Sequence, residues 1–294
     1  MTGGNVRFNQ RLMTGERNMK EYRKILFKKT EQRDLFMDIF VPENTEKPPI
    51  ILWVHGGGWN ELNRTWSLVM PLLAHGYAIA STDYRYCDET PMPGQMLDLK
   101  DALLFVRKHG DEYGYDGSRI CISGDSAGAH LACLVGVSAG NREWETTDGD
   151  YSVQAIIDIS GPISFGPMVQ AGAKAGDYPN IERLLNTPAD SKNFYSAAAA
   201  ADPITYINGT EPPVLIIHGS EDPVVPAFQA RRFRNALEEA GDKVHMYYVP
   251  GGLHSMGGDL FDRVATEFLD YYLKGRKTVT EPKVLDCHYR KYPI

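Results

Sequence analysis

The chain has 294 residues, 43% of them hydrophobic and 23% charged, a composition typical of a globular protein that can bury a sizeable core. Its formal net charge of -7 and the lack of a basic stripe argue against a nucleic-acid-binding surface. No segment approaches the roughly 18 apolar residues of a membrane span. No secretory leader is visible either, so we expect a cytoplasmic protein.

The predicted elements begin with a basic stretch, residues 1–24, which we expect to form a surface helix or a frayed N-terminal arm. Segments 22–30 and 33–42 predict a hairpin at a sheet edge. From residue 48 onward, strand-like runs alternate with helix-like runs, and several strands are continuously apolar. This alternation predicts one mostly parallel, doubly wound α/β sheet with helices on both faces. The strands are expected at 48–56, 77–85, 119–125, 153–160, 212–219 and 243–251, and the helices at 94–110 (ending at Gly110), 127–138, 226–240 and 258–273.

Residues 162–207 interrupt the alternation with prolines, glycines and an alanine run that has no regular period. A connection of this length in a compact domain is usually functional, and we interpret it as a small lid insertion. Residues 1–294 are therefore predicted to form a single domain, with an N-terminal arm (1–24) and a C-terminal tail (276–294). The cysteines have no CxxC spacing and are expected to be reduced and structural; they are Cys87, Cys121, Cys133 and Cys287.

The third parallel-sheet strand leads into Gly124-Asp125-Ser126-Ala127-Gly128, which matches the G-x-S-x-G pattern of a nucleophile elbow. In such an elbow the serine occupies a strained turn between a strand and a helix. Side chains two residues to either side would collide, which explains the glycines. Because the motif lies between a predicted strand and a predicted helix, we expect Ser126 to be a nucleophile.

His254, in VPGGLHSMGG, is the predicted base. A serine hydroxyl is a weak nucleophile near neutral pH and needs an adjacent base. His254 lies in a loop after the last predicted strand, where it could face the elbow. His218 ends a strand and His130 lies one helical turn past Ser126, so both are expected to be packed or supporting residues.

Asp222, in HGSEDPVVP, is the predicted carboxylate that orients the histidine. It follows the penultimate predicted strand, and it completes the chain order Ser126, Asp222, His254 that nucleophile-elbow hydrolases use. Its structural alternative is an ordinary Asp-Pro turn. Asp202 and Glu221 are the reserve candidates for the acid.

Three consecutive glycines occur in ILWVHGGGWN (51–60), although glycine destabilises a regular helix or strand. Acyl transfer places negative charge on a carbonyl oxygen, and backbone N–H groups can approach that oxygen only where no side chain intervenes. We therefore predict an oxyanion hole from the N–H groups of Gly57, Gly58 and Ala127. A phosphate-binding loop would need a Lys-[ST] ending, which is missing. Trp59 and Asp125 are candidate substrate-binding residues, and Trp59 has packing under the lid as its alternative.

Four motifs occur in order: HGGGW (55–59), GDSAGAHLA (124–132), HGSEDPVVP (218–226) and GGLHS (251–255). Through them, residues 26–273 resemble the α/β-hydrolase superfamily. More narrowly, the chain is similar to the HGGG-bearing carboxylesterases, which include hormone-sensitive-lipase-like enzymes and bifunctional feruloyl/acetyl-xylan esterases. Only 54 residues precede His55, fewer than the usual cap of the lipase-like group, which favours the carbohydrate-esterase branch. The elbow also resembles that of kynurenine formamidases.

Motifs and resemblance together predict a serine carboxylesterase that acts on short-acyl or aryl-acyl esters, with acylated sugars among the candidate substrates. We expect neither a metal nor an organic cofactor. An arylformamidase-like amidase of the same fold is the first alternative. A hydrolase-fold binding module without activity is the second, and it would be expected to have lost a member of the triad. The leaving group and the oligomeric state stay open.

Overall fold

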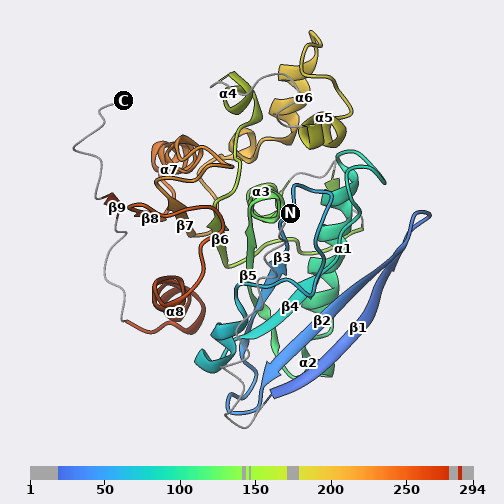
Figure 1. Cartoon of the computed structure of the whole chain (residues 1–294). Coiled ribbons are helices and arrows are strands. Elements are labelled where there is room, and N and C mark those ends of the chain that lie inside the picture. Colours follow the sequence, from blue (N-terminus) through green and yellow to red (C-terminus); the bar gives the residue numbers. More distant parts are fainter. Residues whose placement is uncertain (1–18, 141–143, 146, 171–178, 278–283, 287–294) are drawn as a thin grey trace, which may run out of the picture.

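The computed structural model of the chain describes residues 19–140, 144–145, 147–170, 179–277 and 284–286 (Figure 1). The strands are β1 (Met19–Lys29), β2 (Asp34–Pro42), β3 (Pro49–Val54), β4 (Ala78–Thr82), β5 (Asp116–Asp125), β6 (Ala155–Ile159), β7 (Val214–Gly219), β8 (Val244–Val249) and β9 (Val284–Asp286). The helices are α1 (Gly94–Lys108), α2 (Gly110–Tyr113), α3 (Ala127–Val137), α4 (Phe165–Gln170), α5 (Pro179–Leu185), α6 (Phe194–Ala201), α7 (Phe228–Ala240) and α8 (Asp259–Lys274). Two 3₁₀ helices are η2 (Met70–His75) and η4 (Pro203–Tyr206).

One sheet carries the strands of the described residues in the order β1-β2-β4-β3-β5-β6-β7-β8-β9. The β1–β2 hairpin lies at one edge, and β2 pairs with β4 antiparallel. All the other neighbouring strands are parallel. The sheet is thus mostly parallel and doubly wound, as the alternation of strands and helices predicted.

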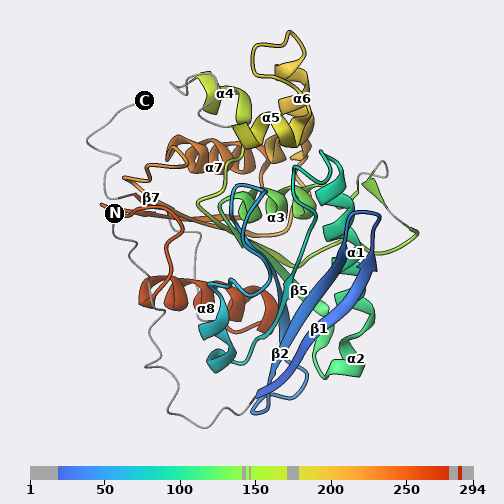
Figure 2. The ribbon, with the colours of Figure 1, turned by 45° about the vertical axis from the view of Figure 1, so that its right-hand side comes forward.

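Helices cover both faces of the sheet, and the side chains of β3 show how. Ile50 and Leu52 join the core beneath α1, α3 and α7, whereas Ile51 and Trp53 join the core beneath η2 and α8. Figure 2 shows α8 on the opposite side of the sheet from α3 and α7. Because both faces are buried, a central strand has no polar side, and this explains its continuous run of apolar residues.

The predicted elements are present with small differences in their bounds, and three expectations need correction. Residues 19–24 belong to β1 rather than to the arm. A bulge between Tyr22 and Ile25, with Lys24 at φ 54°, breaks the alternation that would have shown the strand. Gly110 begins α2 instead of ending a helix. The predicted tail contains β9, which pairs with β8 and is too short for a readable pattern. Residues 1–18 lie outside the described part of the chain.

The predicted insertion contains α4, α5, α6 and η4, and its alanine run lies in α6. Figures 1 and 2 show α4, α5 and α6 grouped beyond α3 and α7. Gln229 of α7 fixes its start, since its Oε1 accepts the N–H groups of Ile163 and Ser164 at 2.8 and 2.7 Å. Asp202 closes its end by accepting the Ser164 hydroxyl and the Phe165 N–H at 3.0 and 2.8 Å. A lid function stays a prediction.

Candidate active site

Three of the predicted site residues follow strands of the parallel sheet. Ser126 comes directly after β5, Asp222 after β7 and His254 after β8. The carboxyl ends of parallel strands share one edge, so the topology brings these loops to the same end of the molecule. The insertion, which follows β6, leaves the sheet at that edge too.

Ser126 occupies a strained turn at the start of α3, with φ 52° and ψ -123°. The flanking glycines permit this turn. A Cβ on Gly124 would lie 2.4 Å from the carbonyl of Gly128, and a Cβ on Gly128 would lie 2.2 Å from the carbonyl oxygen of Val54. The predicted collision at both glycine positions is therefore confirmed, and α3 packs directly against the end of β3.

His254 and Asp222 form a hydrogen-bonded pair, with 2.8 Å between His254 Nδ1 and Asp222 Oδ2. Asp222 Oδ1 accepts the N–H groups of Val224 and Val225 at 2.8 and 2.9 Å. Burial opposes ionisation of Asp222, but the bonds from His254 and the two backbone donors outweigh it, so its pKa lies below the ordinary value. An ionised Asp222 holds the His254 proton on Nδ1 and leaves Nε2 to accept one.

The loop that carries His254 and the elbow at Ser126 are both hydrogen-bonded to the end of β6. The Ser255 N–H donates to Ser160 Oγ at 3.3 Å, just beyond β6. The Ser126 N–H donates to the carbonyl of Ile159, the last residue of β6, at 2.8 Å. Both loops are therefore anchored at the end of β6. The sequence pattern offered no signal for the role of Ser160, because that role depends on a contact between distant segments.

The glycine loop curls back against β5. Gly57 and Gly58 have φ values of 94° and 56°, the left-handed region that favours glycine. Asp125 Oδ1 accepts the Gly56 N–H at 2.9 Å, and the Asp125 side chain is 3% exposed. Burial raises the pKa of Asp125, while bonds from the Ser255 side chain and the Gly56 N–H act against it. Asp125 thus contacts the glycine loop, and its predicted contact with substrate stays untested.

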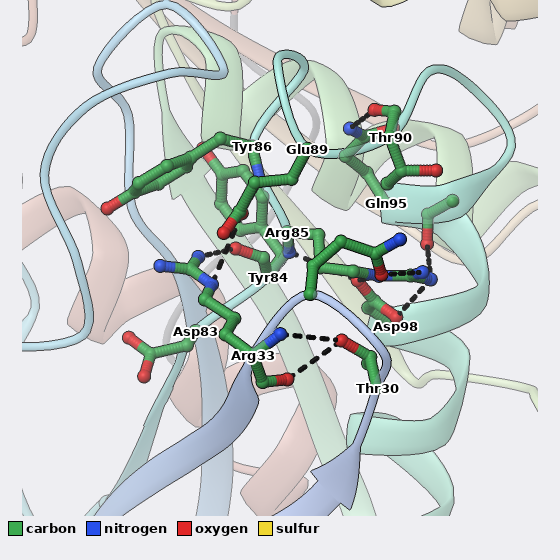
Figure 3. A network of polar contacts seen from close by, with 12 residues as sticks. Thr30, Arg33, Asp83, Tyr84, Arg85, Tyr86, Glu89, Thr90, Gln95 and Asp98 are labelled. Carbon is green, nitrogen blue, oxygen red and sulfur yellow. Dashed lines mark hydrogen bonds and ion pairs between the residues drawn. The ribbon is translucent and has the colours of Figure 1, made fainter.

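A polar network behind the glycine loop connects it to the hairpin. The Tyr84 hydroxyl donates to the carbonyls of His55 and Gly56 at 3.0 and 3.3 Å, and its ring stacks on His55 with centroids 4.3 Å apart. Figure 3 shows Arg33, from the hairpin, reaching the Tyr84 carbonyl and pairing with Glu89. Sequence reasoning did not assign this supporting role to Tyr84.

Trp59 and the two supporting histidines are buried. The Trp59 Nε1–H donates to His130 Nδ1 at 3.1 Å, and His130 Nε2–H donates to the Ala201 carbonyl at 2.8 Å. Burial lowers the pKa of His130 to about 4, which suits a neutral ring with one donor and one acceptor. His218 Nε2 donates to the Val225 carbonyl at 2.9 Å. The packed or supporting roles expected of both histidines are confirmed. A contact of Trp59 with substrate stays a prediction.

The reserve acids lie elsewhere. Asp202 bonds within the insertion, and burial raises its pKa to about 7 despite the hydrogen bonds from Phe165 and Ser164. Glu221 is exposed. The carboxylate that contacts His254 is that of Asp222.

A surface hollow of about 390 Å³ lies at the amino-terminal end of β3 and β5, away from Ser126. Its cations already have partners: Arg276 and Lys274 pair with Asp270 at 3.0 and 3.1 Å, and Arg119 pairs with Asp116 at 2.6 Å. We assign it no part in the site.

Cys87, Cys121 and Cys133 are free and buried, as expected, whereas Cys287 falls outside the described part of the chain. None of the described helices is both long and apolar enough to cross a membrane.

The family model BD-FAE matches residues 37–237 of the chain. The chain is 31% identical over 230 residues to Esterase LipC of Mycobacterium tuberculosis (strain ATCC 25618 / H37Rv), covering 76% of this chain and 56% of LipC. It is 26% identical over 233 residues to the isoprenylcysteine alpha-carbonyl methylesterase ICME of Arabidopsis thaliana, covering 76% of this chain and 54% of that protein. The chain thus spans about half the length of the curated relatives it matches.

Solved structures show the same fold. A truncated carbohydrate esterase from gut microbiota superposes with a TM-score of 0.79 at 26% identity, over 88% of this chain and 99% of that one. Esterase B from Lactobacillus rhamnosis superposes with a TM-score of 0.73 at 18% identity, over 87% and 85% of the two chains. The fold is therefore the α/β-hydrolase fold, as the motifs predicted.

Proposed function

The chain belongs to the BD-FAE family, and we propose that it is a serine hydrolase that cleaves carboxylic esters with a short acyl or aryl-acyl group. The observation that carries the proposal is the 2.8 Å bond between His254 Nδ1 and Asp222 Oδ2, in loops at the same sheet edge as the strained turn of Ser126. Acylated sugars are the substrates we favour, since a carbohydrate esterase shares this fold over nearly its whole length.

In the proposed reaction, the Ser126 Oγ attacks the ester carbonyl carbon while His254 Nε2 takes the hydroxyl proton. The ionised Asp222 stabilises the imidazolium that forms. The tetrahedral intermediate collapses, the C–O bond to the leaving alcohol breaks, and His254 returns the proton to that oxygen. A water molecule then attacks the acyl-Ser126 ester with the same proton transfers, which releases the acid and restores the serine.

The N–H groups of Gly57, Gly58 and Ala127 are the proposed oxyanion donors. None of them donates to a carbonyl or a side chain among the described residues, so all three are free to receive a ligand oxygen. The Gly56 N–H is already used by Asp125. Donors held in place before the reaction stabilise the developing charge without reorganisation, and each is worth about 10²–10³ in rate.

The direct test is Ser126→Ala, assayed with 4-nitrophenyl acetate. We expect a loss of at least about 10⁴-fold in kcat, because the acyl-enzyme can no longer form. Ser118→Ala, which changes an exposed serine at the amino-terminal end of β5, is the control and should keep kcat within twofold. Wild-type rates in Ser126→Ala would overturn the proposal. In a series of 4-nitrophenyl esters with acyl chains of increasing length, activity should fall beyond short acyl groups. A separate comparison of acetylated xylo-oligosaccharides, methyl ferulate and N-formylkynurenine would distinguish ester cleavage from formamide cleavage.

A further inference from the structure

Asn180 of α5 lies beside the glycine loop, and Arg183 of the same helix contacts Asn180. Asn180 Nδ2 is 3.1 Å from the position that a Cβ on Gly58 would occupy. One turn further along the helix, Arg183 Nη1 donates to Asn180 Oδ1 at 3.1 Å. Because the Asn180 oxygen accepts from Arg183, the amide NH₂ is the group that faces Gly58. The Arg183 guanidinium is therefore connected through Asn180 to Gly58, whose N–H is a proposed oxyanion donor.

The position of α5 is set by packing and by backbone bonds. Ile181, Leu184 and Leu185 are buried in the core that lies under the insertion. The Leu184 carbonyl accepts the Met92 N–H at 2.8 Å, which ties the helix to the segment before α1. With the opposite face of α5 buried, Asn180 is held against the glycine loop by the fold.

Both polar groups have unused hydrogen-bonding capacity. Asn180 Nδ2 donates to no group among the described residues, and Arg183 has no carboxylate within ion-pair distance there. The Arg183 side chain is exposed, and its only hydrogen bond in the described chain is the one to Asn180. An exposed arginine alone is ordinary, but this one holds the Asn180 amide, whose NH₂ lies beside Gly58 of the glycine loop.

We propose that Asn180 and Arg183 form a substrate subsite for a carboxylate carried near the scissile ester. The inference rests on the proposed function and narrows it, from esters in general to esters with an anionic group. A guanidinium presents several N–H donors in a planar fork that matches a carboxylate. The Asn180 NH₂ supplies a further donor on the side that faces Gly58. A plain alkyl group would leave all of these donors without a partner.

The experiment compares matched substrates with and without the charge. One pair, 4-acetoxybenzoate and 4-acetoxybenzamide, varies the leaving group, and the other pair, 4-nitrophenyl 4-carboxybenzoate and 4-nitrophenyl 4-carbamoylbenzoate, varies the acyl group. The selectivity is the ratio of kcat/KM for the anionic member to kcat/KM for the neutral member. Arg183→Gln is the test variant. Lys192→Gln is the matched control, because Lys192 is an exposed cation of the same insertion and its loss changes the net charge equally.

In at least one pair, Arg183→Gln should lower the wild-type selectivity by about tenfold, mainly through KM of the anionic member, and kcat/KM of the neutral member should stay within twofold. Intrinsic reactivity cancels in this comparison of the two proteins. Asn180→Asp, which places a like charge beside the substrate carboxylate, should lower the selectivity further, and Lys192→Gln should leave it unchanged. Equal selectivity in wild type and Arg183→Gln for both pairs, with normal hydrolysis of the neutral members, overturns the subsite alone. If the wild type hydrolyses none of the four esters, the subsite is overturned; if 4-nitrophenyl acetate also shows no Ser126-dependent hydrolysis, the proposed function is overturned with it.

Discussion

Asp222→Asn should lower kcat for ester hydrolysis by about 10⁴-fold and leave the fold intact. In the wild type, Asp222 Oδ1 accepts the N–H groups of Val224 and Val225, and Oδ2 accepts from His254 Nδ1. The asparagine oxygen would keep the place that faces the two backbone donors, because an NH₂ there would meet only other donors. The NH₂ would then face His254 Nδ1, which would have to accept. His254 would carry its proton on Nε2, the atom that must receive the proton of Ser126.

A 10⁴-fold loss corresponds to about 5.4 kcal/mol of activation free energy, far more than the roughly 0–1 kcal/mol of an exposed ion pair. The assay measures kcat with 4-nitrophenyl acetate from pH 6 to 9, with Tm from circular dichroism as the check on folding. Glu221→Gln, which removes the adjacent exposed carboxylate, is the control and should stay within twofold. The proposed role of Asp222 is contradicted if Asp222→Asn keeps more than a tenth of the wild-type kcat, or if Glu221→Gln loses as much activity as Asp222→Asn.

Two further predictions concern buried residues. Tyr84→Phe removes the hydroxyl that holds the carbonyls of His55 and Gly56, and should lower kcat about fivefold to tenfold with KM within twofold; a rise in KM at unchanged kcat would contradict it. Asp158 is fully buried, and burial raises its pKa to about 7. Between about pH 4 and pH 7 the folded state therefore keeps a proton on Asp158 that the unfolded state releases. The free energy of unfolding consequently falls as the pH rises through this range. Asp158→Asn removes this titration, so urea unfolding at pH 5, 6 and 7 should show a slope of unfolding free energy less negative by up to about 1.4 kcal/mol per pH unit; identical slopes would contradict the buried, protonated carboxyl.

Local backbone chemistry explains why much of the site could be predicted from sequence. The elbow needs glycine at positions 124 and 128, because a Cβ at either one would meet backbone atoms within 2.4 Å. Those glycines are separated by a fixed number of residues, so the requirement appears in the sequence as a motif. The order of Ser126, Asp222 and His254 could be predicted for a related reason: each follows a parallel strand, and the strands could be recognised by their apolar runs.

The errors arose where the deciding contact is not local. The start of β1 is not recognised from the sequence because a bulge between Tyr22 and Ile25 hides the alternation of the strand. β9 is not recognised from the sequence because its three residues carry no strand pattern. Only the pairing with β8 makes it a strand. Both are edge strands, which depend on one neighbour and have fewer buried positions to shape their sequence.

The insertion marks the limit of sequence reasoning most clearly, and it is also where selectivity is expected to reside. Asn180 lies beside Gly58 in the fold, although the two residues are far apart in the sequence. Nothing in the seven residues of α5 distinguishes the polar side of this helix from any solvated helix face. The elbow must satisfy the same backbone geometry whatever ester is cleaved, so its sequence is constrained by covalent structure. A substrate subsite must satisfy only the ligand, and many side chains on many scaffolds could do so. Catalytic residues of this fold can therefore be predicted from one sequence, whereas the groups that choose the substrate become visible only when α5 is placed beside the glycine loop.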